Sequence, residues 1–285
     1  MKKYLQLANQ ILRYGSWKGS GQNFNLNRAQ SLENLHEFIP QKSNVKAGSV
    51  EASSVNNLVA QAAFIKSAFR TKGRHLCAQN LCYIRVPKAA NTSVGYEMLV
   101  KKYPGLRDKS VDETQINFLS DVNLSKLEDA GTETFFTVVR NPFARLVSVY
   151  RDFFETNHDE FIYADYLFGI LRQKISFAEF VERTSQIPDR LKDQHIRSQY
   201  LFVEPYKRKG IDVKIFQLEE KGSLVSFLND YGIELPHLNK SLESYDYIQY
   251  YNKALIQQVY EIYKTDIEKF GYRETYQTLT ERFKI

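Results

Sequence analysis

The chain has 285 residues, of which 43% are hydrophobic and 14% aromatic, so it can bury a sizeable core and is neither fibrous nor disordered. Its two cysteines, Cys77 and Cys82, cannot form a disulfide framework and lie in no Cys/His cluster at metal-ligand spacing. We therefore expect a reducing compartment and no metal site. The formal net charge of +6 favours an anionic partner.

The N-terminal segment, residues 1–17, starts basic, but polar residues interrupt its apolar run, so it lacks the core of a signal peptide. Leu5, Ala8 and Ile11 lie at helical spacing, which predicts a short amphipathic helix that docks on the main body or on a partner. A homo-oligomer contact is one such role. We find no stretch that is long and apolar enough to span a bilayer. We expect a cytoplasmic protein, with peripheral contact at the inner membrane face as the alternative.

Composition predicts two parts, an N-terminal helix and flexible arm over residues 1–54 and a main domain over residues 55–285. From Lys18 onward Gly, Ser, Asn and Gln predominate, as in a loose connector. The main domain then starts with apolar residues at helical spacing between Val55 and Phe69.

Strand, turn and helix patterns alternate along the main domain. Three short apolar runs have the composition of buried strands, at residues 81–86, 135–139 and 212–218. A helical pattern follows each of them, and a last helix over about 253–270 stops at Gly271. The alternation predicts an α/β fold with a P-loop-like central parallel sheet flanked by helices, in which ligands bind at the carboxyl ends of the strands.

The turn after the first predicted strand has the composition of a phosphate cradle. Lys88 adds positive charge, Thr92 and Ser93 add hydroxyl donors, and the small Ala89 and Ala90 let an anion approach a helix N-terminus. The alternative is that the hydroxyls only cap the helix and the lysine is solvated. A nucleotide-kinase P-loop needs Lys directly followed by Ser or Thr, an order that this turn lacks, which argues against ordinary ATP binding.

The turn after the second predicted strand carries a second group of candidate anion ligands. Arg140 stands at the carboxyl end of the strand, where its planar guanidinium suits a phosphate monoester. Ser148 lies two helical turns further on and contacts the same anion if the helix runs beside the pocket. Arg145 and Arg151 fit a surface or ion-pair role better than a ligand contact.

Together the two motifs resemble those of the sulfotransferases that use 3′-phosphoadenosine 5′-phosphosulfate (PAPS), above all the carbohydrate branch. The family pattern P-K-x-x-x-T-S, which binds the 5′-phosphosulfate, is matched from Pro87 to Ser93. The pattern R-x-P-x-x-R-x-x-S-x-Y, which binds the 3′-phosphate, is matched from Arg140 to Tyr150. The resemblance thus implies a PAPS site made of Arg85, Pro87, Lys88, Ala89, Ala90, Asn91, Thr92, Ser93, Arg140 and Ser148.

Further segments resemble particular branches of that family. Residues 85–88 look like the version in uronyl 2-O-sulfotransferases, whereas residues 193–199, 218–220 and 238–241 resemble chondroitin and HNK-1 type enzymes. Cytosolic small-molecule sulfotransferases usually place Trp where this chain has Val94. A sugar hydroxyl is therefore the expected acceptor, rather than a phenol or a steroid.

The resemblance implies transfer of the sulfuryl group from PAPS to a carbohydrate hydroxyl, with 3′-phosphoadenosine 5′-phosphate as product and no metal required. We expect Lys88 to place positive charge near the bridging oxygen. A base near the attacking hydroxyl would help, and His195, within the matched segment 193–199, is the expected one. Asp112 and Glu113 are the alternatives to it.

Two other functions stay open at this point: a nucleotide-dependent phosphotransferase of the P-loop-like kinase kind, and a non-catalytic protein that binds anionic glycans. The first predicts stabilisation by ATP with magnesium, and the second predicts binding without transfer. Nucleic-acid binding is not expected, since the basic residues gather around two phosphate-sized pockets and no recognised nucleic-acid motif accompanies them.

Overall fold

A computed structural model describes these residues: 16–19, 22–25, 74–107, 122–123, 133–156, 165–166, 171–172, 175–189, 192–235 and 246–284. The chain divides into two compact units, of which the larger comprises Thr71–Val149, Pro188–Arg190 and Gln194–Ile285. All residues predicted to bind PAPS lie in the larger unit. The helix predicted from Leu5, Ala8 and Ile11 and the helix predicted over residues 55–69 lie outside the described residues.

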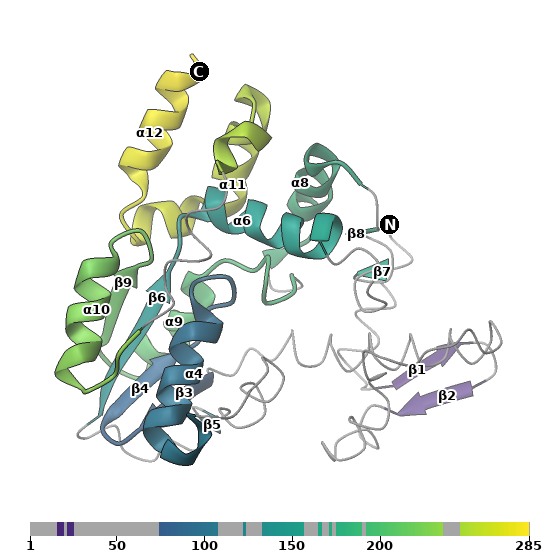
Figure 1. The fold of residues 1–285 in the computed structure, drawn as a ribbon. Coiled ribbons are helices and arrows are strands. Elements are labelled where there is room, and N and C mark those ends of the chain that lie inside the picture. The colour runs from purple at the N-terminus through teal and green to yellow at the C-terminus, as the bar shows by residue number, and fades with distance from the viewer. Residues whose placement is uncertain are drawn as a thin grey trace. The chain divides into compact units, whose positions relative to one another are not determined.

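A five-stranded sheet in the order β5-β3-β4-β6-β9 forms the centre of the larger unit (Figure 1). Its strands are β3 (Arg74–Ala78), β4 (Leu81–Ile84), β5 (Val122–Asn123), β6 (Thr134–Val139) and β9 (Val213–Gln217). The three predicted strands are β4, β6 and β9, and they are parallel to one another as expected. The predicted α/β fold with a mostly parallel sheet is therefore confirmed.

The edge of the sheet formed by β5 and β3 differs from the prediction, because β3 runs antiparallel to β4 and β5 runs antiparallel to β3. Only Gln79 and Asn80 join β3 to β4, and Gln79 has a positive φ of 56°. A connection this short forces a hairpin, since a parallel pair needs a crossover of a dozen or more residues. The sheet is therefore mixed at this edge and parallel through its centre.

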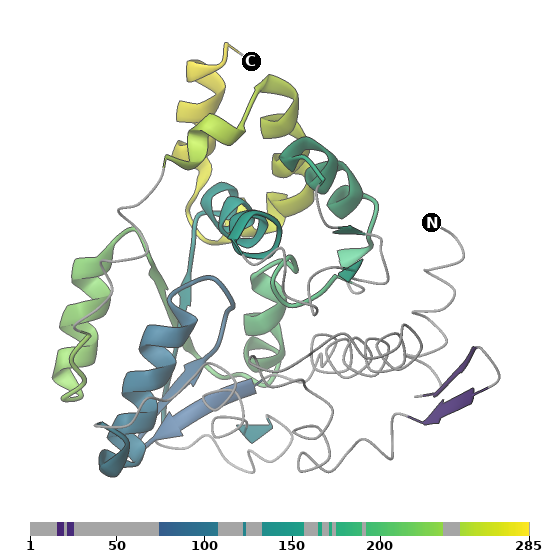
Figure 2. The same ribbon diagram turned by 45° about the vertical axis from the view of Figure 1, so that its right-hand side comes forward.

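Helices cover the two faces of this sheet, as Figures 1 and 2 show. On one face, α4 (Asn91–Lys102) and α10 (Lys221–Asp230) pack through Met98 and Leu228 against side chains such as Tyr83 and Phe136, all of them buried. On the opposite face, Tyr206 of α9 (Tyr200–Lys207) meets Phe135. The alternation of neighbouring β6 residues between the two faces explains why the strand reads as a continuous apolar run.

The helix ends follow the sequence signals that predicted them. Asn141 caps α6 (Pro142–Tyr150) by accepting the Phe143 N–H at 3.0 Å, and Pro142 is the first helical residue. Gly232 follows α10 and Gly271 follows α11 (Lys253–Lys269), both with positive φ. The last helix is α12 (Arg273–Arg282). Short 3-10 turns occupy Pro104–Leu106 and Tyr247–Tyr250.

The smaller unit contains α8 (Phe177–Ser185), which Ser176 caps, and the π-helical continuation of α6 over Arg151–Thr156. Its short strands form two antiparallel pairs, β1 (Ser16–Gly19) with β2 (Gln22–Asn25) and β7 (Asp165–Tyr166) with β8 (Leu171–Arg172). The composition of the arm did not predict the first pair.

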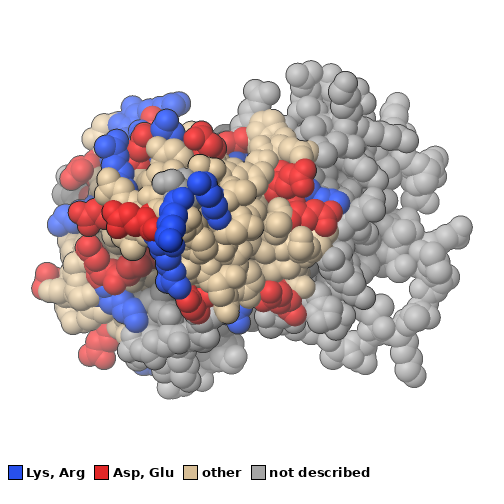
Figure 3. Space-filling view, turned by 90° about the horizontal axis from the view of Figure 1, so that it is seen from above, with Lys and Arg blue, Asp and Glu red and all other residues tan. Residues whose placement is uncertain are grey.

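Among the described residues, no helix combines the length and the hydropathy that a membrane span requires. On the face shown in Figure 3, Lys and Arg side chains lie interspersed with Asp and Glu over the described residues. The described residues therefore form no single basic patch on that face.

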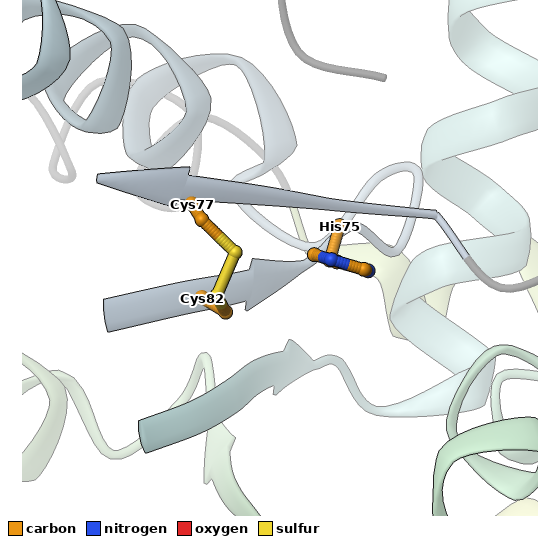
Figure 4. Close-up of side chains that lie close together, drawn as sticks. All are labelled: His75, Cys77 and Cys82. Atoms are coloured by element: carbon orange, nitrogen blue, oxygen red, sulfur yellow. A yellow bond between two sulfur atoms is a disulfide. The ribbon is translucent and has the colours of Figure 1, made fainter. Parts of the chain in front are cut away.

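The two cysteines face each other across the β3–β4 hairpin and form a disulfide (Figure 4). Their Cα atoms are 4.1 Å apart, and His75 lies beside them. From the sequence we expected no disulfide framework and no Cys/His cluster at metal-ligand spacing, and we foresaw neither this single disulfide nor the nearby His75. Spacing along the chain concealed the cluster because the hairpin, which the sequence did not predict, sets Cys77 directly opposite Cys82.

Candidate functional site

Two loops follow the carboxyl ends of two neighbouring parallel strands and therefore start on the same side of the sheet. The first loop, residues 85–90, follows β4, and the second loop, residues 140–141, follows β6. The guanidinium of Arg140 donates from Nη1 to the backbone carbonyl of Lys88 at 3.3 Å. The structure therefore brings the two predicted anion-binding motifs into direct contact, although more than fifty residues separate them in the chain.

The backbone of the first loop is strained at two positions. Lys88 has a φ of 65° and Ala90 a φ of 54°, both in the left-handed region that glycine favours. Between them Ala89 donates its N–H to the carbonyl of Val86 at 3.3 Å, which closes a tight turn. Such strain persists only where the surrounding structure fixes it, and it is frequent at ligand sites. These outliers therefore mark the first loop as a candidate site.

Helix α4 begins at the end of the first loop with an N-terminus that no side chain caps. Its N-cap is Ala90, and its first turn contains no acidic residue. Thr92 and Ser93 are the second and third helical residues, exposed and half-buried respectively, so the alternative in which they cap the helix is wrong. A helix start of this kind offers backbone N–H groups and partial positive charge to an anion.

Arg85 and Asn91 connect the two ends of the first loop. Both side chains are buried, and Arg85 donates from Nε to Oδ1 of Asn91 at 2.8 Å. Pro87 and Ala89 between them are buried as well, whereas Lys88 is half-buried. The lysine is thus the residue of this stretch whose charge has most access to solvent.

Arg145, which fitted a surface role in the sequence, is in fact buried and holds the backbone of two separate segments. Its Nε donates to the carbonyl of Pro87 at 3.0 Å, within the first loop. Its terminal nitrogens donate to the carbonyls of Arg197 at 2.7 Å and Gln194 at 3.0 Å. These two residues flank the half-buried His195, so a single guanidinium ties the turn of the predicted base to the first loop.

Gln199 holds the backbone of the second loop with both ends of its amide. This side chain is buried, its Oε1 accepts the Arg140 N–H at 2.9 Å, and its Nε2 donates to the Arg140 carbonyl at 2.8 Å. Asp266 in turn accepts the backbone N–H groups of Gln199 at 2.7 Å and Tyr200 at 2.9 Å. Burial raises the pKa of Asp266 to about 6, against these two hydrogen bonds, which lower it.

Glu219 fixes the next residue of the second loop. One carboxylate oxygen accepts the Asn141 N–H at 2.8 Å, and the other accepts the hydroxyl of Tyr272 at 2.9 Å. The amide of Asn141 donates to the hydroxyl of Tyr247 at 3.1 Å. Burial is the main cause that raises the pKa of both tyrosines. The backbone from which the Arg140 side chain extends is therefore rigid on both sides.

For the remaining predicted residues the structure shows no hydrogen bond to the two loops or does not describe them. Ser148 is half-buried and lies two turns along α6 from the second loop. Asp112 and Glu113, the alternative bases, lie outside the described residues. Sequence reasoning missed the roles of Gln199 and Glu219, although both fall in segments that resembled family motifs.

A family model described as sulfotransferase family matches residues 77–273, which is more than two thirds of the chain. The chain belongs to the sulfotransferase family. Searches of curated proteins and of solved structures gave no match. The matched region runs from β3 to the start of α12, so it contains both loops and the side chains that fix them. The resemblance drawn from the two motifs is confirmed for the family as a whole.

In chemical terms, this sulfotransferase presents two cationic loops to one region. The first loop contributes Lys88 and leads into the N-terminus of α4, which no side chain caps, and the second loop contributes the Arg140 guanidinium. Charge at two adjoining loops suits a ligand with two separate anionic groups better than one with a single anion. Since Arg85 and Arg145 bind protein acceptors, their main effect is to shape the first loop.

Proposed function

We propose that this sulfotransferase transfers the sulfuryl group of PAPS to a hydroxyl of a carbohydrate, such as a glycan, polysaccharide or glycolipid. The observation that carries the proposal is the contact between Arg140 Nη1 and the Lys88 carbonyl at 3.3 Å. PAPS has a phosphosulfate at its 5′ position and a phosphate at its 3′ position. Two adjoining cationic loops match these two groups, with the 5′ end at the first loop and the 3′-phosphate at Arg140.

Lys88 and the start of α4 would stabilise the charge that develops during transfer. The sugar oxygen attacks the sulfur in line, the bond from sulfur to the bridging oxygen breaks, and 3′-phosphoadenosine 5′-phosphate leaves. In this proposal the bridging oxygen lies beside the turn that carries Lys88, and the N–H groups and hydroxyls of Thr92 and Ser93 hold the sulfonate and phosphate oxygens. Positive charge supplied in this way requires no metal.

His195 is our candidate for the base that takes the proton of the sugar hydroxyl. The Arg145 guanidinium holds the carbonyls of Gln194 and Arg197, on the two sides of His195, and also the carbonyl of Pro87 in the first loop. The turn that carries the imidazole is thereby fixed relative to Lys88. Replacement of His195 by Ala should abolish the acidic limb of the pH–rate profile, and an unchanged limb would assign the base elsewhere.

The proposal is tested by incubating the full chain with labelled PAPS and a panel of polysaccharides and analysing the products by mass spectrometry. Lys88→Ala should lower turnover about 10²–10³-fold, whereas Lys102→Ala, a change at an exposed lysine in the last turn of α4, should leave it unchanged. In the same samples 3′-phosphoadenosine 5′-phosphate should raise the melting temperature without metal. Stabilisation by ATP with magnesium instead, or full turnover of Lys88→Ala, would overturn the proposal.

A further inference from the structure

The β3–β4 hairpin carries a cluster of chemically reactive side chains that the proposed transfer reaction does not use. His75 and Cys77 are two residues apart on β3 and therefore share one face of the sheet. Cys82 lies directly opposite Cys77 on β4. One ring nitrogen and two sulfur atoms lie within 4.8 Å of one another, as Figure 4 illustrates. Three ligand atoms of the kinds that zinc prefers thus meet at one point.

The hydrogen bonding of His75 supports a ligand role for the imidazole. The ring has no exposed surface and packs edge-on against Phe135 and Tyr206. Nδ1 is hydrogen-bonded to the hydroxyl of Tyr206 at 2.9 Å, while Nε2 has no hydrogen-bond partner among the described residues. Leaving a buried polar nitrogen unsatisfied is unfavourable, so such an atom calls for an explanation.

A metal ion at Nε2 would account for this arrangement. A histidine that binds a metal through one nitrogen usually hydrogen-bonds through the other, which fixes the orientation of the ring. The bond from Nδ1 to the Tyr206 hydroxyl has this form.

We propose that, when the disulfide is reduced, Cys77, Cys82 and His75 form a binding site for one thiophilic divalent cation, with Zn²⁺ as the expected occupant. Two thiolates and one imidazole are three of the four ligands of a tetrahedral zinc site. A water molecule completes the coordination from the side of Cys77, which is only half-buried. The proposal is independent of the donor and acceptor of the sulfotransferase reaction.

The disulfide and the cation exclude each other. A dithiol reductant supplies two electrons and two protons, the bond between the two sulfur atoms breaks, and the reductant becomes a disulfide. Each cysteine thiol then gives up its proton to solvent as it binds the cation. The hairpin is therefore cross-linked either by the disulfide or by the ion, and β4 continues within three residues of Cys82 into the first loop.

The test uses Co²⁺ as a spectroscopic substitute for Zn²⁺ on the reduced, metal-free full chain under anaerobic conditions. We expect one equivalent to bind with a thiolate-to-cobalt charge-transfer band, and Zn²⁺ to displace it. The chain contains only two cysteines, so such a band can come only from this pair. The oxidised wild-type chain is the matched control, because it should bind no cobalt without any substitution.

His75→Phe tests the imidazole, since it keeps a planar ring in the same apolar surroundings. Circular dichroism checks that the variant is folded, and its Co²⁺ affinity should fall at least tenfold. A reduced, folded wild-type chain that binds no cobalt with a thiolate band would overturn the site. Undiminished affinity in folded His75→Phe would equally overturn the assignment of His75 as a ligand.

Discussion

Replacing Gln199 by Met should lower the stability of the fold and, as a second effect that can be measured apart from it, disturb the position of Arg140. The substitution keeps the length of the side chain and removes the two hydrogen bonds, at 2.9 and 2.8 Å, to the Arg140 backbone. A buried donor or acceptor left without a partner costs about 1–3 kcal/mol, so two of them cost about 2–6 kcal/mol. The apolar Met side chain offsets a small part of this, and we expect a net loss of about 2–4 kcal/mol, which a domain of ordinary stability survives.

The substitution should also weaken the binding of the 3′-phosphate more than the binding of the rest of the nucleotide. Arg140 is assigned to the 3′-phosphate, so the affinity for 3′-phosphoadenosine 5′-phosphate should fall at least tenfold, while the affinity for 5′-AMP should change less. Urea unfolding measures the stability, and isothermal titration calorimetry with the two nucleotides measures the selectivity.

Gln186→Met is the matched control for Gln199→Met. Gln186 is exposed at the end of α8, so its replacement should change the free energy of unfolding by less than about 0.5 kcal/mol. If Gln199→Met unfolds like Gln186→Met, the amide does not stabilise the second loop. If it is destabilised but keeps the wild-type ratio of the two nucleotide affinities, its role in positioning Arg140 is refuted.

Three further substitutions test other parts of the structure. Arg145→Lys keeps the charge but cannot reach three carbonyls as the guanidinium does, so urea unfolding should show a loss of about 2–4 kcal/mol, and an unchanged midpoint would contradict the contacts. The Asp266 pKa is raised from 3.8 to about 6, so this carboxyl contributes stability below pH 3.8 that is lost as the pH rises through 6. In Asp266→Asn the melting temperature should therefore fall less between pH 4 and about 6 than in the wild type. An equal slope of melting temperature against pH would refute this. Gly271→Ala, at a φ of 78° and with its Cβ 3.0 Å from Nε2 of Gln217, should cost about 1–2 kcal/mol, whereas Gly105→Ala has open space and should be nearly neutral.

The parts of the fold that the sequence predicted are those with a local signal. Strands β4 and β6 lie inside the sheet and are buried on both faces, so each reads as an apolar run, and β9 at the edge keeps an apolar majority. Pro142 and Gly271 mark helix ends because each residue type has its own backbone preference. The prediction that the two loops meet follows from their places after neighbouring parallel strands.

The parts that the sequence missed depend on contacts between distant residues. Strand β3 contains His75 and starts at Arg74, so its composition is not that of a buried strand, and only pairing with β4 identifies it. The bonds of Arg145 to Pro87 and of Gln199 to Arg140 each join residues more than fifty positions apart. The periodicity of a sequence contains no signal for such a bond, and the sequence alone does not tell a buried arginine from an exposed one.

Taken together, the polar contacts around the two loops divide the charged residues by what they bind. Arg85 and Arg145 are buried against protein oxygens, and their removal would leave those oxygens unsatisfied, so their replacement should reduce stability first. Lys88 is half-buried and has a strained backbone, and the hydrogen bond from Arg140 goes to its backbone carbonyl. The bond between the loops thus uses the backbone of Lys88, so replacing its side chain should reduce turnover while this bond remains.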